Sequence, residues 1–251
     1  MSSENVNYSL EELAGYRNRI RNLDAQGVVE YFLNHFGAGN IALSSSMSAE
    51  DQVLTDMILK INKDAVVFTL DTGRLPQETY DVIDKTRKKY GANIEVLFPE
   101  KPEVEELVEK HGVNLFYESI ELRRECCYIR KITPLKKKLS TLKAWISGVR
   151  RTQSITRNEV PGVEWDYKFK LFKVNPIFDW TEYQVWDYIR KNDIPYNILH
   201  DRGYPSIGCA PCTRAVKPGQ DLRSGRWWWE PAEQKECGLH GKQEKQVQKG
   251  K

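Results

Sequence analysis

Five cysteines are the residues of this chain that are best suited to chemistry. They stand as the adjacent pair Cys126 and Cys127, the C-x-x-C pair Cys209 and Cys212, and Cys237 near the carboxyl end. Four thiolates form a soft ligand set for a metal ion or an iron–sulfur cluster, and a thiolate that stands apart can act as a nucleophile. The pattern therefore predicts a metal or cluster site and a separate reactive thiol.

Disulfides and zinc are the alternative uses of the four grouped thiols. An odd number of cysteines leaves one unpaired, and residues 1–4 do not begin a basic-then-apolar leader, so we expect a reducing, cytoplasmic location in which disulfides are disfavoured. Zinc ribbons mostly use two C-x-x-C pairs, whereas the side chains of adjacent cysteines diverge. The adjacent pair therefore favours an iron–sulfur cubane, which offers different iron corners to the two sulfurs.

The length and composition fit one large domain with no membrane span. The chain has 251 residues, of which 40% are hydrophobic and 29% charged, and it contains no apolar run of the ~20 residues that cross a bilayer. Its net charge of +3 is too small to argue for a nucleic-acid partner. Residues 136–138 fit an ordinary solvated surface. Other basic residues cluster in a way that predicts convergence on a small polyanion: Arg123, Arg124, Arg130, Lys131, Arg150, Arg151, Arg223 and Arg226.

Short apolar runs alternate with amphipathic segments along the chain. The runs predict strands at residues 41–43, 65–70, 94–98, 143–147 and 171–174. The amphipathic segments predict helices at residues 49–61, 76–91 and 102–111, and one through Val185 and Ile189 that begins with a capping box on Asp179. This alternation predicts an α/β fold with a mostly parallel sheet and helices on both faces.

The two ends of the chain differ from this alternating part. Residues 1–35 carry apolar side chains near helical spacing, which predicts a leading helix that packs on the core or between subunits, so a homo-oligomer is compatible with the sequence. Residues 241–251 are polar, and we expect them to be disordered. One domain over residues 1–240 is the expected organisation.

Three polar loops follow the predicted strands, at residues 44–48, 71–74 and 147–151. In open parallel sheets, ligands bind at the carboxyl ends of the strands, so these loops predict one shared site. The serine-rich loop enters a helix amino end, where free N–H groups and hydroxyls can hold a phosphate or sulfate. It contains no Walker motif and no glycine pair of an ATP pyrophosphatase, and an ordinary helix cap is the alternative for this loop alone.

Several of these motifs occur together in one known family. They are residues 126–135, which open with the cysteine pair, and residues 70–73, 145–151, 208–212, 225–230 and 236–240. In this order the chain resembles the assimilatory sulfonucleotide reductases, specifically the iron–sulfur class that reduces adenosine 5′-phosphosulfate (APS). The resemblance covers residues 40–240 and implies an adenine nucleotide alpha-hydrolase-like fold with a mobile C-terminal segment. One departure lies in the loop of residues 44–51, where relatives often have the pattern Ser-Phe-Gly/Ser-Ala-Glu and this chain has methionine, Met47, in place of phenylalanine.

The resemblance implies a mechanism and a set of site residues. Cys237 would attack the sulfur of APS, releasing AMP and leaving a thiosulfonate, from which thioredoxin or a glutaredoxin, acting in trans, would release sulfite. A 4Fe-4S cluster would be held by Cys126, Cys127, Cys209 and Cys212. Lys131, Arg223 and Arg226 would contact the phosphosulfate. The remaining substrate contacts implied are Ser46, Ser48, Leu70, Asp71, Thr72, Gly73, Gly148 and Arg150.

Substrate choice and two other functions stay open at this point. The 3′-phosphorylated substrate, PAPS, would need an extra cation, for which Arg74, Arg151 and Arg157 are the candidates. An iron–sulfur RNA thiolation enzyme would use a similar fold, but it would need a pyrophosphatase loop. A zinc-stabilised nucleic-acid-binding module would need a concentrated basic face with exposed aromatic side chains, whereas the tryptophans here are grouped.

Overall fold

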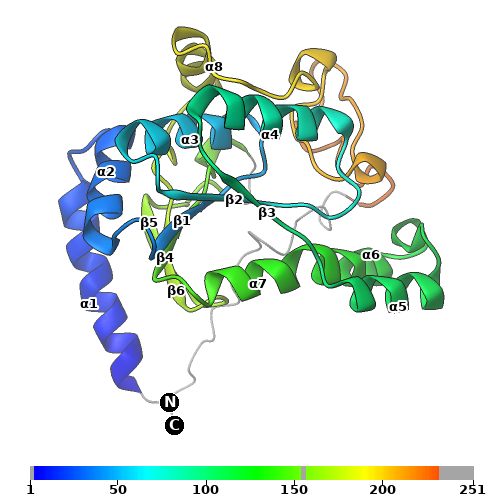
Figure 1. The fold of residues 1–251 in the computed structure, drawn as a ribbon, viewed down its shortest axis with the longest axis horizontal. Helices are drawn as coiled ribbons and strands as arrows, with labels where there is room; N and C mark the ends of the chain where they lie inside the picture. Colours follow the sequence, from blue (N-terminus) through cyan, green and yellow to red (C-terminus); the bar gives the residue numbers. More distant parts are fainter. Residues whose placement is uncertain (1–2, 154–156, 232–251) are drawn as a thin grey trace.

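A six-stranded sheet forms the centre of the computed structural model, which describes residues 3–153 and 157–231 (Figure 1). The strand order is β3-β2-β1-β4-β6-β5. All neighbouring strands are parallel except β5 and β6, which are antiparallel. The strands are β1 (Ile41–Ser44), β2 (Val66–Leu70), β3 (Ile94–Leu97), β4 (Ala144–Ile146), β5 (Val163–Asp166) and β6 (Leu171–Val174). The predicted α/β class with a mostly parallel sheet is thus confirmed.

Helices cover both faces of the sheet, because alternate residues of each strand point to opposite sides. Ile41 and Leu43 of β1 enter the larger core, while Ala42 between them enters a second, smaller one. The larger core is covered by α2 (Ala25–Phe36), α3 (Ala49–Ile61), α4 (Gln77–Tyr90) and α8 (Glu182–Lys191). The smaller core lies under α7 (Thr133–Leu139), through Leu135 and Leu139.

The amino-terminal segment forms two helices where the sequence predicts one. α1 (Ser3–Ile20) ends before a short turn, and Asp24 then caps α2 by accepting a hydrogen bond from the Gly27 N–H at 2.8 Å. Tyr16 of α1 packs edge-on against Phe32 and Phe172. This contact joins the segment to the larger core of the same chain.

Two local predictions near the far edge of the sheet need correction. The cap of α8 is Thr181, whose hydroxyl accepts from Gln184 N–H while the Gln184 side chain accepts from Thr181 N–H, so the capping box lies two residues after the predicted Asp179. The second correction is strand β5, which the sequence does not predict. Its sequence is short and half polar, as suits an edge strand that pairs on one side.

The cysteine pair lies in a continuous helical stretch that is built from three elements. α6 (Ile120–Cys127) passes directly into η2 (Tyr128–Ile132), a π-helix, and then into α7. A third apolar cluster surrounds the end of α6 and includes side chains from α5 (Lys101–His111) and η1 (Leu115–Tyr117). In Figure 1 these helices lie beside the carboxyl-terminal orange segment. Within the described ranges, no helix is both long enough and apolar enough to cross a membrane.

Candidate active site

Two loops meet at the point where the strand order reverses. β1 and β4 are neighbours, and the chain continues from them in opposite directions, from β1 to β2 on one side and from β4 to β5 and β6 on the other. This is the position at which open α/β sheets bind ligands. A cavity of about 230 Å³ opens there and is lined by residues of the loops after β1 and β4, by one side of α8 and by cations from three segments. The cavity is our candidate active site.

The serine-rich loop turns sharply before α3. Met47 holds the turn with a left-handed backbone (φ 60°), and its N–H donates to the Ser45 hydroxyl at 3.1 Å. Ser48 is the N-cap of α3 and has an ordinary φ of −80°, so this position needs no glycine. Its hydroxyl makes no capping hydrogen bond. Ser46 and Ser48 both line the cavity, with the amino end of α3 behind them.

Asp51 joins the two loops. Its carboxylate accepts hydrogen bonds from Ser46 N–H at 2.6 Å and from the Ser46 hydroxyl at 2.5 Å, and also from Gly148 N–H at 3.1 Å. Gly148 is required there, since a Cβ at this position would lie 2.3 Å from an Asp51 carboxylate oxygen. Burial raises the pKa of Asp51 to about 6, although the hydrogen bonds from Ser46 oppose the shift. A single carboxylate thus fixes the spacing of the two loops.

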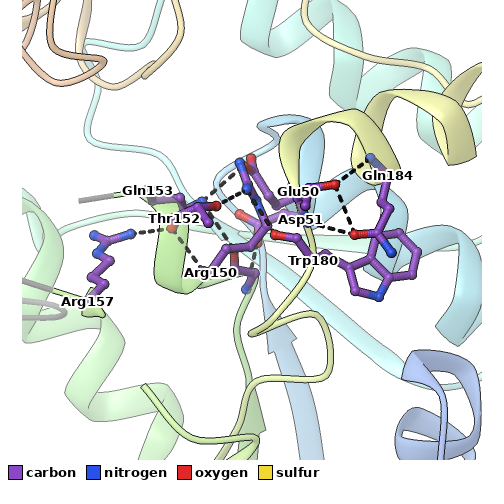
Figure 2. A network of polar contacts seen from close by, with 10 residues as sticks. Glu50, Asp51, Arg150, Thr152, Gln153, Arg157, Trp180 and Gln184 are labelled. Carbon is purple, nitrogen blue, oxygen red and sulfur yellow. Dashed lines mark hydrogen bonds and ion pairs between the residues drawn. The ribbon is translucent and has the colours of Figure 1, made fainter. Parts of the chain in front are cut away.

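Glu50 and Arg150 form a second bridge between the same loops, shown in Figure 2. The Arg150 guanidinium donates to Glu50 Oε1 through Nη2 at 2.8 Å and Nε at 3.0 Å. Its Nη1 donates to the Thr152 hydroxyl and the Trp180 carbonyl. Burial favours the neutral form of Glu50, but Arg150 and Gln153 outweigh it and hold the pKa of Glu50 below its usual value. The hydrogen bonds of Arg150 therefore stabilise the cavity wall itself.

Cations from other segments also line the cavity. Lys131 comes from the π-helix η2, and Arg223 and Arg226 come from the segment that ends the described chain. Arg226 is buried and passes so close to Gly208 that a Cβ there would lie 2.3 Å from two guanidinium nitrogens. Arg157 also lines the cavity and donates to Gln153 Oε1 at 2.6 Å. The site therefore combines a helix amino end with several positive side chains, which suits a ligand with two anionic groups.

The loop after β2 faces the cysteines. Leu70 lines the cavity, but Asp71, Thr72 and Gly73 do not. Asp71 accepts from Gly73 N–H at 2.7 Å and from the Tyr80 hydroxyl at 3.0 Å, which closes a tight turn. The Thr72 hydroxyl lies 3.2 Å from the Cys209 sulfur. These three residues therefore connect the sheet to the thiols.

Four of the five cysteines lie in one place. Cys126, Cys127, Cys209 and Cys212 share the third apolar cluster. In residues 3–153 and 157–231, no group of three His, Cys, Asp or Glu side chains is arranged to hold a single metal ion. Cys237 lies outside the described residues.

The charged groups around the cysteines act unequally on their pKa values. Burial raises the pKa of the Cys212 thiol to about 12, and the neighbouring Cys209 and Cys127 add to this shift. Burial also acts to raise the pKa of Cys209, but Lys131, the Thr72 hydroxyl and nearby arginines outweigh it and lower that pKa below its usual value. Lys131 therefore influences both the cavity and the thiol cluster.

The structure brings together most of the residues predicted from the sequence. Those that line the cavity are Ser46, Ser48, Leu70, Lys131, Gly148, Arg150, Arg223 and Arg226. The two loop-bridging acids, Glu50 and Asp51, were not predicted. Gln153, which donates to Glu50 at 3.0 Å, was not predicted either.

Comparisons with known proteins agree with this geometry. Residues 40–215 match the phosphoadenosine phosphosulfate reductase domain. The chain belongs to this family. It is 50% identical over 200 residues to an adenosine 5′-phosphosulfate reductase of Burkholderia cepacia, covering 80% of each chain. It is 49% identical over 221 residues to a protein of the same name from Pseudomonas aeruginosa, covering 86% of this chain and 81% of the relative.

Solved structures support the same fold. A phosphoadenylyl-sulfate reductase from Candida auris, crystallised as a phosphate complex, superposes with a TM-score of 0.70 and 26% identity. The match covers 82% of this chain and 97% of that protein. An FMN adenylyltransferase of Candida glabrata superposes with a TM-score of 0.52 at 14% identity, a likeness of fold alone.

Proposed function

We propose that this protein reduces adenosine 5′-phosphosulfate to sulfite and AMP, with a thioredoxin or a glutaredoxin as the reductant. The observation that carries the proposal is the cavity at the sheet reversal, which is lined by the serine loop and the amino end of α3 together with Lys131, Arg223 and Arg226. APS has an anionic phosphate joined to an anionic sulfonate, and a cavity that combines a helix amino end with several cations fits such a ligand. Relatives about half identical to this chain carry the name of that activity.

In the first step, the Cys237 thiolate attacks the sulfonate sulfur. A sulfur–sulfur bond forms while the bond between that sulfur and the bridging oxygen breaks, and the electron pair leaves with AMP. AMP gains negative charge as it departs, so cations at the bridging oxygen stabilise the transition state. Lys131, Arg223 and Arg226 are assigned to this task, and the serine loop with Gly148 is assigned to the nucleotide.

In the second step, a thiolate of the reductant attacks the Cys237 sulfur and sulfite leaves. The second thiol of the reductant then closes a disulfide with the first and releases Cys237 as a thiol, so two electrons pass from the reductant to the sulfur of sulfite. Such reductants keep thiols reduced in the cytoplasm, where we place the reaction. We assign Cys237 as the residue that both partners must reach.

The four grouped thiols fit a 4Fe-4S cluster. They lie together in one apolar cluster, and cysteine thiolates are the usual ligands of iron–sulfur clusters. Cys126, Cys127, Cys209 and Cys212 would hold it. When bound, the cluster would supply a fixed charge distribution beside the substrate site rather than electrons for the reaction. Lys131, which lowers the pKa of Cys209, lies four residues after Cys127 and also lines the cavity.

PAPS, alone or together with APS, is the alternative substrate. Of the three cations considered for a 3′-phosphate, Arg157 lines the cavity. Arg74 instead donates to the Val113 carbonyl and stacks on Phe116, and Arg151 donates to the Val160 carbonyl. Arg157 is therefore the residue to change when the two substrates are compared. The relatives named above are reductases, so RNA thiolation receives no support from them.

The test is sulfite release by anaerobically purified protein supplied with thioredoxin. We expect sulfite from APS, little from PAPS, and none from Cys237→Ser protein that still contains its iron. No sulfite from either substrate by iron-loaded wild-type protein would refute the proposal. Equal release from both substrates would change the assignment to a dual reductase, and an Arg157→Gln variant that loses only the PAPS activity would identify the residue responsible.

A further inference from the structure

Trp227 belongs to the apolar cluster that contains the four thiols, and its neighbour in sequence, Arg226, lines the substrate cavity. Its side chain is 1% exposed, and two guanidinium carbons lie within 5 Å of its ring centroid, that of Arg123 at 4.6 Å and that of Arg226 at 4.8 Å. Guanidinium groups at this distance over an indole ring are attracted by its quadrupole, and more strongly where water is excluded. The ring therefore couples two buried cations that come from distant parts of the chain.

The first of these cations cannot move freely. Arg123 is held by Glu230 in a two-pronged ion pair, with Nε donating to Oε1 at 2.8 Å and Nη2 donating to Oε2 at 2.6 Å. The side chains of both partners are at most 2% exposed. Two parallel charge-assisted hydrogen bonds fix the plane of a guanidinium as well as its position. Arg123 therefore provides a rigid support for the Trp227 ring.

The backbone of Trp227 is held in an unusual conformation. Its φ is 41°, in the left-handed region that costs free energy for a residue with a bulky side chain. Hydrogen bonds enforce it, because Trp227 N–H donates to the Cys212 carbonyl at 3.2 Å and Glu230 N–H donates to the Trp227 carbonyl at 2.8 Å. Such conformations persist where the surroundings over-determine them, and they concentrate at functional sites.

The second cation, Arg226, is the one that lines the cavity. Its backbone forms an isolated bridge with Thr213, next to Cys212. Its guanidinium lies against Gly208 on one side and against the Trp227 ring. The position of this guanidinium thus depends on the ring, which depends in turn on the Arg123–Glu230 pair.

We propose that Trp227 is a positioning residue that aims Arg226 at the anionic group of the substrate, and that the buried Arg123–Glu230 pair holds Trp227 in place. The inference rests on the proposed function, because it takes the ligand of Arg226 to be the phosphosulfate of APS. Trp227 itself is not among the residues that line the cavity. Its effect on binding must therefore pass through Arg226, and this dependence can be measured.

The experiment measures equilibrium binding of APS by iron-loaded Cys237→Ser protein, in which no turnover occurs. Trp227→Leu removes the aromatic face, and Trp227→Phe keeps a smaller one. We expect APS to bind about tenfold more weakly to the leucine variant and about two- to threefold more weakly to the phenylalanine variant. Trp229→Phe is the matched control, since Trp229 packs edge-on against Tyr117, and it should bind APS as the parent does.

A double-mutant cycle separates positioning from general packing. In an Arg226→Lys background, Trp227→Leu should weaken APS binding by less than about twofold, because the guanidinium that it positions is already gone. An equal loss in both backgrounds, or no loss in either, would overturn the proposal. If the leucine variant loses iron or its thermal transition, the same cycle with Trp227→Phe decides, and its loss must again disappear in the Arg226→Lys background.

The results that would refute the proposed function differ from those that would refute the role of Trp227. Parent protein that does not bind APS refutes the substrate and, with it, the role given to Arg226. Parent protein that binds APS, while Cys237-containing protein releases no sulfite, refutes the reaction but leaves the binding cycle able to test Trp227.

Discussion

Removing one charge from the Arg123–Glu230 pair should strongly destabilise the protein. In Glu230→Gln, the guanidinium of Arg123 keeps one neutral acceptor and loses its counter-charge, although its side chain is only 2% exposed. An ion that is left buried without its partner retains the full cost of its desolvation. The substitution changes no volume, so its effect reports charge rather than packing.

The expected size follows from the burial and geometry of the pair. Breaking a buried ion pair by removing one partner costs about 3–5 kcal/mol. For a chain of this length, 1 kcal/mol shifts Tm by about 2–4 °C, which gives a fall in Tm of about 6–20 °C. Replacing both partners, as in Arg123→Met with Glu230→Leu, should recover most of the loss, since no uncompensated charge remains.

Anaerobic thermal unfolding followed by circular dichroism measures these changes. Glu78→Gln is the matched control, because Glu78 pairs with Arg202, whose side chain is 58% exposed, at the same charge type and a similar distance of 2.7 Å. That variant should lose about 1 kcal/mol or less. A fall in Tm for Glu230→Gln no larger than that of the control would refute the reasoning, since it would mean that water or another anion reaches Arg123.

Three further predictions concern the cavity and the thiols. The pKa of Asp51 is raised from 3.8 to about 6 in the folded protein, so the folded state binds this proton more tightly than the unfolded chain does. The free energy of unfolding should therefore fall by about 1 kcal/mol as the pH rises from 5 to 7.5. Urea unfolding of Asp51→Asn should not show that fall. Gly208→Ala should raise KM for APS about tenfold with little change in Tm, because the new Cβ displaces only the flexible end of Arg226; an unchanged KM would show that this guanidinium does not hold substrate. Cys209→Ser should lose iron and acid-labile sulfide while Cys237→Ser retains both, and equal iron in the two variants would contradict the ligand assignment.

The mostly parallel sheet was predictable because its sequence signal is local and strong. Residues 66–70 are apolar almost without interruption, as a strand covered on both faces must be, and Gly91 ends α4 in the left-handed conformation that glycine favours. Because the strands are parallel, the polar loops that follow them meet at the carboxyl edge of the sheet. The antiparallel strand Val163–Asp166 could not be predicted, because an edge strand buries less apolar surface and its polar side chains interrupt the apolar run.

The bridging acids could not be recognised from the sequence. Glu50 and Asp51 stand in the first turn of a helix, where carboxylates are common because they favour the helix dipole. Only the folded chain shows that Asp51 reaches Gly148, 97 residues away, and that Glu50 reaches Arg150. For Arg150 the sequence predicts a contact with the substrate, whereas in the structure its guanidinium donates to Glu50, Thr152 and a main-chain carbonyl.

The Arg123–Glu230 pair is equally invisible in the sequence. Its partners are 107 residues apart, and each stands in a segment that already has another explanation, beside the cysteine pair or after three tryptophans. Cys237 is the opposite case. Its place in a short motif near the carboxyl end is a sequence property, and it lies outside the described residues.

The π-helix between the cysteine pair and α7 sets a constraint on how this chain can change in length. In it, Thr133 N–H donates to the Tyr128 carbonyl, so one turn contains an extra residue. Because the wide turn absorbs one residue, deleting a single residue there would restore an ordinary helical turn and leave the segments on either side in nearly the same relative orientation. A residue deleted from the ordinary turns of α6 or α7 would instead rotate everything before it by about 100° against everything after it, and Cys126 and Leu135 could not then both face their own apolar clusters. Among homologous chains, insertions and deletions should therefore collect in exposed stretches such as residues 217–220 and, within this helical stretch, in the π-turn.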